Sequence, residues 1–373
     1  MIELRERTKA TKGNVHEHEN TMCIVTRSAE GAMIVGIDVG GANTKVATSE
    51  GFTDTLYAPL WKSDAILPDV LSEVKQTLEL VDEAVGVVMT GELCDCFATK
   101  RAGVLTIKEA VSATFDDVRF FDTGCTFKDG SAVDKSPLSF ASTNWLASAT
   151  FLSEHYADAL FVDIGSTTTD VIPIVRGEIK ARRRDLERLN SGELIYSGIL
   201  RTNVAALLKR VRIGGEGKEY RISSELFAIT ADAYRALGYI TECDYTCESP
   251  DSYAFVGREE AEKSRLCAMQ RLSRVVCSDL EEIGVDGAIA IAEQVKKAQV
   301  EELAASMKTI CEKYGLEAVL SVGLGDFIVK EAAESLTIPV VSLSSIHGEN
   351  ISAVFPAFST AKLLEQHISY EGR

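Results

Sequence analysis

Apolar runs that end in turns of small residues recur along this chain of 373 residues. Residues 34–39 (IVGIDV) predict a buried strand, and residues 45–48 predict a second strand that returns after a turn of two glycines. Residues 159–164 (ALFVDI) and 170–174 predict another pair of strands around a hydroxyl-rich turn. The shared order of strand, aspartate, small-residue turn and strand indicates an internal repeat of one supersecondary unit.

Apolar residues at every third or fourth position mark the segments around these strand pairs as helices. The predicted helices cover residues 69–83, 223–237, 259–278, 287–314 and 351–368. Further strands are predicted at 84–90, 318–325 and 337–343. Because strands and helices alternate, the pattern predicts an α/β fold, and the strand-turn-strand units favour mixed rather than all-parallel sheets.

The first glycine turn carries groups that suit phosphate binding. Its residues are Asp38, Gly40, Gly41, Asn43, Thr44 and Lys45. Two glycines let backbone N–H groups approach an oxyanion closely, while Thr44 adds a hydroxyl donor and Lys45 a positive charge. Asp38 ends its strand and could hold Mg²⁺, which prefers carboxylate and phosphate oxygens. The alternative is a simple hairpin with glycine in a left-handed turn.

The second turn repeats this pattern and is rich in hydroxyl groups. Its residues are Asp163, Gly165, Ser166, Thr167, Thr168, Thr169 and Asp170. Hydroxyl residues directly after a glycine suit anion binding better than a core, although a threonine-rich edge strand is the alternative. A third glycine turn, at Gly323 and Gly325, follows a later strand. Together the three turns predict a phosphate site between two domains.

The overall charge restricts the partners of the chain. It has 56 acidic and 39 basic residues, a formal charge of −17. General binding to nucleic acid or to an anionic membrane is excluded, because such binding depends on Lys and Arg. The hydrophobic share of 46% is typical of globular proteins, and no run approaches the roughly 18 to 20 apolar residues of a membrane span. Small molecules are therefore the expected partners.

The cysteines and the N-terminal segment favour a cytoplasmic protein. Nine cysteines without a repeating framework indicate a reducing compartment, and neither closely spaced pair has the two-residue separation usual for structural zinc. Residues 1–32 are polar and lack the apolar core of a signal peptide. They are expected to form a disordered extension, with Met33 as an alternative start of the natural chain.

The three turns resemble the phosphate loops of the actin, heat-shock protein and sugar kinase superfamily. The resemblance implies two ribonuclease-H-like domains with mixed sheets around a cleft, and Asp38 and Asp163 as the carboxylates that face the metal. The expected domains are 34–156 with the C-terminal helix 351–368, and 157–350 with an inserted helical region at about 180–278.

Five segments carry a narrower resemblance. They are residues 87–104, 143–148, 161–172, 185–205 and 226–247. They are similar to the archaeal and methylotroph members of the hydantoinase/oxoprolinase family that act in methanofuran biosynthesis. The resemblance implies a transferase that condenses an aminomethyl-furanmethanol diphosphate with the phenol oxygen of γ-glutamyltyramine and releases diphosphate. The turns would then hold a diphosphate leaving group with Mg²⁺, and ATP would not be required.

A basic stretch and three carboxylates complete the predicted site. Residues 180–212 carry nine basic and three acidic residues. Arg201, among apolar neighbours, is the best candidate there for phosphate contact, and solvated helix faces are the alternative. A phenol reacts faster once deprotonated, so a carboxylate near the acceptor would help. Glu92, Asp95 and Asp170 are the candidates, with helix caps or surface charges as the alternative.

Two other functions would use the same turns. An ATP-dependent amidohydrolase of the hydantoinase or oxoprolinase type would hydrolyse ATP to activate an amide, but such enzymes are generally longer chains. A non-enzymatic actin-like protein would bind nucleotide and polymerise or report, which leaves residues 87–104 and 185–205 without a role. Assembly into a homo-oligomer stays open.

Overall fold

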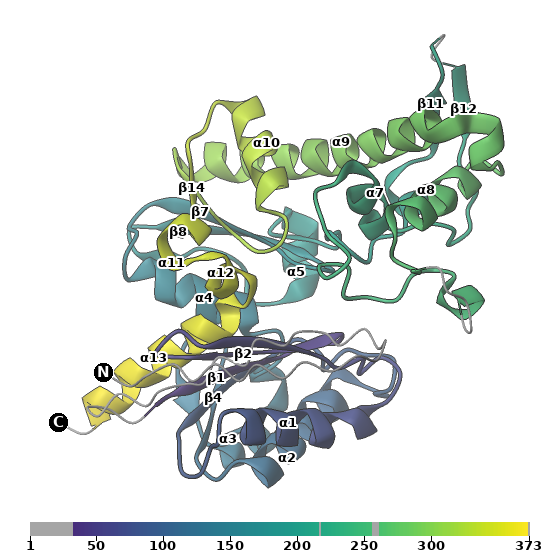
Figure 1. Ribbon diagram of the computed structural model, residues 1–373. Coiled ribbons are helices and arrows are strands. Elements are labelled where there is room, and N and C mark those ends of the chain that lie inside the picture. Colours follow the sequence, from purple (N-terminus) through teal and green to yellow (C-terminus); the bar gives the residue numbers. More distant parts are fainter. Residues whose placement is uncertain (1–32, 216–217, 256–260, 372–373) are drawn as a thin grey trace, which may run out of the picture. The chain divides into compact units, whose positions relative to one another are not determined.

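Two mixed β-sheets organise the chain, and each contains an antiparallel hairpin next to a parallel strand (Figure 1). The computed structural model describes residues 33–215, 218–255 and 261–371, so the predicted extension at 1–32 lies outside the described residues. The first sheet has the order β3-β2-β1-β4-β5-β6. Its strands are β1 (Val35–Val39), β2 (Asn43–Thr48), β3 (Thr53–Tyr57), β4 (Val85–Met89), β5 (Val118–Phe121) and β6 (Phe127–Lys128).

The second sheet has the order β10-β8-β7-β13-β14, and β9 pairs with β8. Its strands are β7 (Ala159–Ile164), β8 (Thr169–Val175), β9 (Glu178–Ile179), β10 (Leu194–Ile195), β13 (Val319–Val322) and β14 (Val340–Ser342). In both sheets the first strand pairs antiparallel with its hairpin partner and parallel with a later strand. The predicted internal repeat and the predicted fold class are therefore confirmed.

The helices of the described residues are α1 (Leu67–Thr77), α2 (Lys100–Thr114), α3 (Gly130–Lys135), α4 (Asn144–Ser153), α5 (Asp185–Ser191), α6 (Val204–Leu207), α7 (Thr230–Leu237), α8 (Arg265–Arg274), α9 (Leu280–Tyr314), α10 (Asp326–Leu336), α11 (Ser344–His347), α12 (Glu349–Ala353) and α13 (Phe355–Glu371). Four of them, α4, α13, α9 and α10, cover the two faces of the second sheet. Phe161 shares a core with α4 and α13, whereas Leu160 and Val162 share one with α9 and α10. This alternation follows from the period of two in a strand.

Helix α13 packs closely against the first sheet, as predicted for the tail (Figure 1). A Cβ atom on Gly36 of β1 would lie 2.0 Å from the Ala357 carbonyl oxygen, and one on Gly86 of β4 would lie 2.9 Å from a Thr360 methyl group. Gly36 is required because the helix backbone comes so near, whereas at Gly86 the close neighbours are side chains of the helix. The same core includes side chains from both sheets, so α13 and α4 join the two halves.

The region inserted after β10 forms a separate small core. The hairpin of β11 (Arg210–Ile213) and β12 (Lys218–Arg221) packs with α7 and α8 against α9. Inside α9, Gly284 has φ 69° and ψ 175°, which is not helical, so the element is two helices joined at a kink.

Several predicted helix boundaries were wrong. The helix predicted over 69–83 ends at Thr77, and Glu79 has φ 51°. Leu78 and Leu80 remain buried after the chain leaves the helix, so their apolar character extended the pattern too far. The predicted helix 223–237 likewise begins only at Thr230, and the tail helix is interrupted at Val354.

The strands of the two sheets fall on either side of the predicted boundary between residues 156 and 157. The described residues nevertheless belong to one compact unit, because α4 and α13 pack on both sheets. Within the described residues, every helix is too short or too polar to cross a membrane.

Candidate active site

The first predicted phosphate turn is a tight hairpin between β1 and β2. Asp38 pairs with Lys45 in the register of these strands, and the Gly40 N–H donates a hydrogen bond of 3.1 Å to the Asn43 carbonyl. A Cβ atom on Gly40 would lie 2.6 Å from that carbonyl oxygen, and one on Gly41 would lie 2.7 Å from the Cys94 sulfur. Gly40 is therefore required by space, because its neighbour is a backbone carbonyl, whereas a Cβ atom on Gly41 would displace the Cys94 side chain.

The second turn has the same construction between β7 and β8. Asp163 pairs with Asp170 in register, and the Gly165 N–H donates a hydrogen bond of 3.0 Å to the Thr168 carbonyl. The Ser166 and Thr167 hydroxyls lie 3.4 Å apart on the turn, which is only half-buried. Hydroxyl groups on this turn are thus available to an anion.

The third turn packs on the end of β7. Gly323 has φ 89°, and a Cβ atom there would lie 2.5 Å from the Ile164 carbonyl oxygen and 2.6 Å from an Asp163 carboxylate oxygen. The Gly325 N–H donates a hydrogen bond of 3.1 Å to the same carbonyl. The structure therefore brings the second and third turns together at Asp163.

Two aspartates at the turns, the buried Asp38 and the half-buried Asp163, have pKa values close to neutrality. Burial raises the pKa of Asp38 to about 6, although Lys45 and a hydrogen bond from Asn144 oppose the shift. Burial, with the charges of Asp170 and Asp38, raises the pKa of Asp163 to about 7, and Lys45 again opposes it. These mutual effects mean that Asp38, Asp163 and Lys45 share one electrostatic environment.

This pair of carboxylates suits a divalent cation. One oxygen of Asp38, Oδ1, is buried without a hydrogen-bond partner, and carboxylate oxygens are hard ligands that Mg²⁺ prefers. Among the described residues, no group of three or more His, Cys, Asp or Glu side chains could enclose a metal. Mg²⁺ commonly binds through one or two carboxylates and completes its shell with water and phosphate oxygens.

Asp170, a predicted base candidate, is held in a buried ion pair. Its carboxylate accepts a hydrogen bond from Arg188, whose side chain is 1% exposed. The Arg188 guanidinium stacks on Trp145, 4.0 Å from the ring centroid, and donates a bond of 3.1 Å to the Glu193 carbonyl. Asp170 therefore serves first to neutralise Arg188.

Glu92 is fully buried and lies at one end of a network of charged side chains. Its Oε1 accepts a hydrogen bond of 2.8 Å from Ser142 and lies 3.5 Å from the Lys100 ammonium, while Oε2 has no partner. Lys100 also bonds Asp185 at 2.7 Å, and Asp185 lies 3.5 Å from Arg188. Burial raises the pKa of Glu92, against the opposing effect of Lys100.

This network of charged side chains was not predicted. It links Glu92, Lys100 and Asp185 to Arg188 and Asp170, across α2, α5 and β8. The only sequence signal was that its members fall in or beside the segments 87–104, 161–172 and 185–205, which were singled out for their resemblance. Asp95, in contrast, is exposed.

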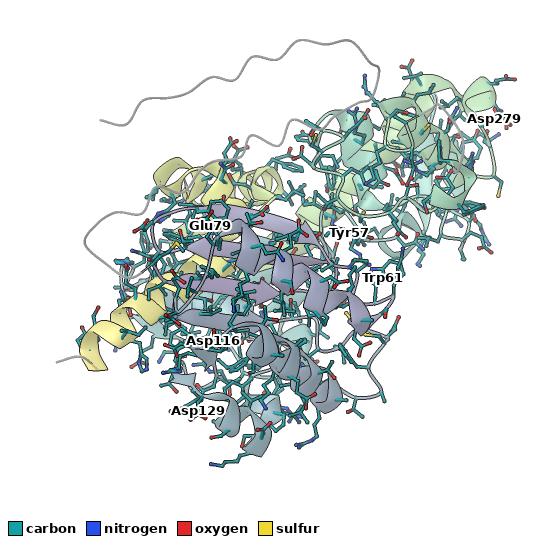
Figure 2. All side chains as sticks on the ribbon, turned by 60° about the horizontal axis from the view of Figure 1, so that its bottom comes forward. Tyr57, Trp61, Glu79, Asp116, Asp129 and Asp279 are labelled. Atoms are coloured by element: carbon teal, nitrogen blue, oxygen red, sulfur yellow. The ribbon has the colours of Figure 1, made fainter. Side chains whose placement is uncertain are left out.

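Arg201, the predicted phosphate contact of the basic stretch, lies beside the second turn. Its N–H donates a hydrogen bond of 3.1 Å to the Ser166 carbonyl, and its guanidinium carbon lies 5.7 Å from the centroid of the Trp61 ring. Trp61 follows β3 and was not predicted as a site residue (Figure 2). Other members of the basic stretch form ion pairs further along the chain, such as Arg210 with Glu219.

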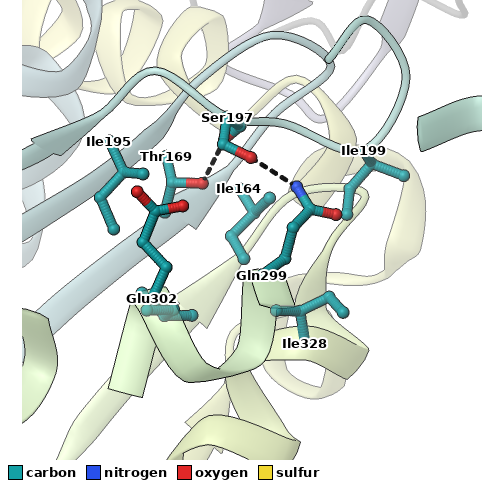
Figure 3. A pocket seen from close by; sticks show the side chains of 9 residues that line it. Ile164, Thr169, Ile195, Ser197, Ile199, Gln299, Glu302 and Ile328 are labelled. Atoms are coloured by element: carbon teal, nitrogen blue, oxygen red, sulfur yellow. Dashed lines mark hydrogen bonds between the residues drawn. The ribbon is translucent and has the colours of Figure 1, made fainter. Parts of the chain in front are cut away.

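A small cavity lies behind the second turn (Figure 3). It measures about 10 Å³ and is lined by Thr169, Ser197, Gln299 and Glu302, among others. The Thr169 hydroxyl donates to the Ser197 carbonyl at 2.7 Å, and Gln299 donates to the Ser197 hydroxyl at 2.6 Å. This volume holds about one water molecule, so the cavity supports the turn and is too small for a substrate.

Comparisons with known proteins place the chain among related sequences. A family model described as hydantoinase/oxoprolinase matches residues 83–367. A (4-{4-[2-(γ-L-glutamylamino)ethyl]phenoxymethyl}furan-2-yl)methanamine synthase of Methanocaldococcus jannaschii is 38% identical over 341 residues, which cover 90% of this chain and 98% of the relative. A synthase of the same name from Methanococcus vannielii is 37% identical over 226 residues, 59% of this chain and 97% of the relative.

Solved structures with a similar chain path are far more distant in sequence. The ethanolamine utilization protein EutJ from Carboxydothermus hydrogenoformans is 14% identical with a TM-score of 0.44, covering 90% of this chain and 92% of its own. A ROK family glucokinase from Streptomyces griseus is 13% identical with a TM-score of 0.42, covering 90% and 99%.

Proposed function

Because the chain belongs to the hydantoinase/oxoprolinase family, and two relatives that it matches share one synthase name, we propose that it catalyses the same synthesis. The reaction condenses an aminomethyl-furanmethanol diphosphate with the phenol oxygen of γ-glutamyltyramine in methanofuran biosynthesis. The observation that carries the proposal is 38% identity over 98% of the Methanocaldococcus jannaschii relative. The product named for both relatives contains the aryl ether that this condensation would form.

The bond changes define what the site must do. The phenol oxygen forms a bond to the CH₂ carbon on the furan ring, the bond from that carbon to the diphosphate oxygen breaks, and the electron pair leaves with diphosphate. The phenol proton passes to a base or to water. The furan ring can stabilise positive charge on the CH₂ carbon, so the main demand is to stabilise the departing diphosphate, and preorganised donors meet such a demand electrostatically.

The three turns supply donors for that task. The donor and positive groups carried by or next to the turns include the half-buried hydroxyls of Ser166 and Thr167, Lys45 opposite Asp38, and Arg201, whose backbone is bonded to Ser166. Asp38 and Asp163 would hold Mg²⁺, which when bound would neutralise charge on the diphosphate oxygens. The shared environment of the two carboxylates and the unpartnered Asp38 oxygen support this assignment.

The three candidate bases differ in their surroundings. Asp170 is neutralised by Arg188, and Glu92 is sealed from solvent, whereas Asp95 is exposed. If Asp95 takes the proton, Asp95→Asn should lower turnover and change its pH dependence, while Glu92→Gln should leave that dependence in place. The opposite result would assign the proton to Glu92.

The test is a coupling assay with Mg²⁺ and either the furan diphosphate plus γ-glutamyltyramine or ATP. The proposal expects the ether product by mass spectrometry, with one diphosphate per product and no ATP turnover. Asp38→Ala and Asp163→Ala should abolish coupling, whereas Asp69→Ala, at an exposed position of α1, should behave like the wild type. ATP hydrolysis without an ether product would favour the amidohydrolase.

We propose the cytoplasm as the compartment of the reaction, because of the thiols. The described part of the chain holds eight free cysteines, which supports a reducing cytoplasm. A measured disulfide in protein isolated from its native cells would contradict this assignment.

A further inference from the structure

A short segment after β3 lies directly against the first phosphate turn. In this segment, residues 58–62, the Ala58 N–H donates a hydrogen bond of 2.9 Å to the Ala42 carbonyl. A Cβ atom on Gly91 would lie 2.8 Å from a Leu60 methyl group and 3.0 Å from the carbonyl of the first glycine of the turn. The segment and the turn are therefore fixed relative to each other.

Charged side chains gather around Trp61 in this segment. The Lys62 ammonium lies 5.1 Å from the Trp61 ring centroid, and the Arg201 guanidinium carbon lies 5.7 Å from it. Lys62 forms an ion pair with Glu248, and the Tyr57 hydroxyl lies 3.4 Å from the same carboxylate oxygen. Figure 2 labels Tyr57 and Trp61 on the first half of the chain, whereas Arg201 and Glu248 come from the second.

This cluster is placed between the two phosphate turns. Arg201 is bonded through its N–H to Ser166 of the second turn, and Leu60 next to Trp61 packs beside the first turn. A ligand whose reacting end occupies the turns could therefore extend along the face of Trp61. Aromatic rings pack favourably on such a face, and nearby cations favour a ligand that carries a negative group.

The Lys62–Glu248 pair is suited to exchange its partners. The side chains are 46% and 38% exposed, and ion pairs with this exposure contribute little to stability. An α-amino acid head group carries an ammonium and a carboxylate next to each other. Such a zwitterion can replace the pair, with its carboxylate on Lys62 and its ammonium on Glu248, so no charge is left without a partner.

We propose that Trp61, Lys62 and Glu248 bind the amino-acid end of the phenolic acceptor, an α-amino acid zwitterion carried on an arylethyl amide. This inference rests on the proposed function, whose acceptor has such a γ-glutamyl group. Lys62 and Glu248 determine specificity for the acceptor and take no part in bond formation. Trp61 packs against the chain that joins the zwitterion to the phenol.

The experiment compares γ-glutamyltyramine with tyramine, which lacks the zwitterion, in the coupling reaction. In the wild type, kcat/KM should favour γ-glutamyltyramine. Lys62→Met and Glu248→Gln should each reduce this preference by about ten- to a hundredfold, as expected for removing one charged hydrogen bond. Lys297→Met removes another solvent-exposed ion pair, in which the Lys297 ammonium lies 3.7 Å from Glu301 on α9, and should keep the preference.

A second comparison excludes a purely structural latch between the two halves. The double variant Lys62→Glu with Glu248→Lys restores an ion pair with reversed charges. A latch would be repaired by this exchange, whereas a zwitterion site would stay impaired, so recovered preference in the double variant would overturn the inference. An equal loss of kcat/KM for both acceptors in the single variants would overturn it as well.

The two proposals fail in different ways. If wild-type protein couples neither acceptor, the proposed function is wrong. If it couples both, and the single variants keep the wild-type preference for γ-glutamyltyramine, only the zwitterion site is wrong.

Discussion

Substitution of Gly323 tests whether the third turn holds the second turn in place. The residue has φ 89°, and an added Cβ atom would lie 2.5 Å from the Ile164 carbonyl oxygen and 2.6 Å from an Asp163 carboxylate oxygen. The backbone carbonyl cannot move freely, and Asp163 lies in a strand that is paired on both sides, with β8 and β13. Gly323→Ala should therefore strain the backbone and displace Asp163 at the same time.

The magnitude has two parts. A side chain at a left-handed φ costs about 1–2 kcal/mol, and overpacking a close contact costs about 1–3 kcal/mol. Gly315→Ala is the matched control, because Gly315 has φ 69° with nothing within 4 Å of an added Cβ atom. Only the first part applies there, so the two variants should differ by about 1–3 kcal/mol in the free energy of unfolding.

Urea unfolding of both variants gives this difference, and the coupling assay gives the effect on the site. Gly323→Ala should lose more stability than Gly315→Ala and should also lose turnover, while Gly315→Ala keeps turnover. Equal stabilities and equal turnover in the two variants would refute the contact between the third turn and Asp163.

Three further predictions concern buried and titrating groups. Arg188→Met should cost about 3–5 kcal/mol by leaving Asp170 buried without a cation, and adding Asp170→Asn should recover part of that loss in urea unfolding. Burial raises the pKa of Asp163 to about 7, well above the 3.8 of a free side chain, so between pH 8 and pH 5 the folded state takes up a proton that the unfolded chain does not. The free energy of unfolding should therefore increase as the pH falls through 7, and it should increase less in Asp163→Asn than in the wild type over the same range. Burial raises the pKa of the Cys94 thiol to about 11, so mass spectrometry should find Cys94 alkylated by iodoacetamide at pH 7.5 more slowly than the exposed Cys277; equal rates would contradict this.

Local pattern was enough to predict the parts of the fold that repeat. The two hairpins, their aspartates and their glycine turns were all predicted, because a strand-turn-strand unit consists of consecutive residues. Helix α4 was not predicted. Seven of its ten residues are buried, from Trp145 to Leu152, so it has no polar face and no helical period to detect.

The site was predictable only as far as it is local. Asp38 and Lys45 face each other across one hairpin, so their proximity followed from the sequence. The pairing of Arg188 with Asp170, and the approach of Arg201 to Trp61, depend on how distant segments pack. Sequence spacing carries no information on such contacts, which is why Trp61 was missed and the ion pair of Asp170, an alternative candidate for the base, was not predicted.

The most direct test of the central claim follows the phenol oxygen. Coupling γ-glutamyltyramine labelled with ¹⁸O in its phenol should give an ether that keeps the label and a diphosphate that has none. This result is expected if the phenol oxygen attacks the CH₂ carbon and the diphosphate leaves with its own oxygen. An unlabelled ether, or product formation only when ATP is consumed, would contradict the account.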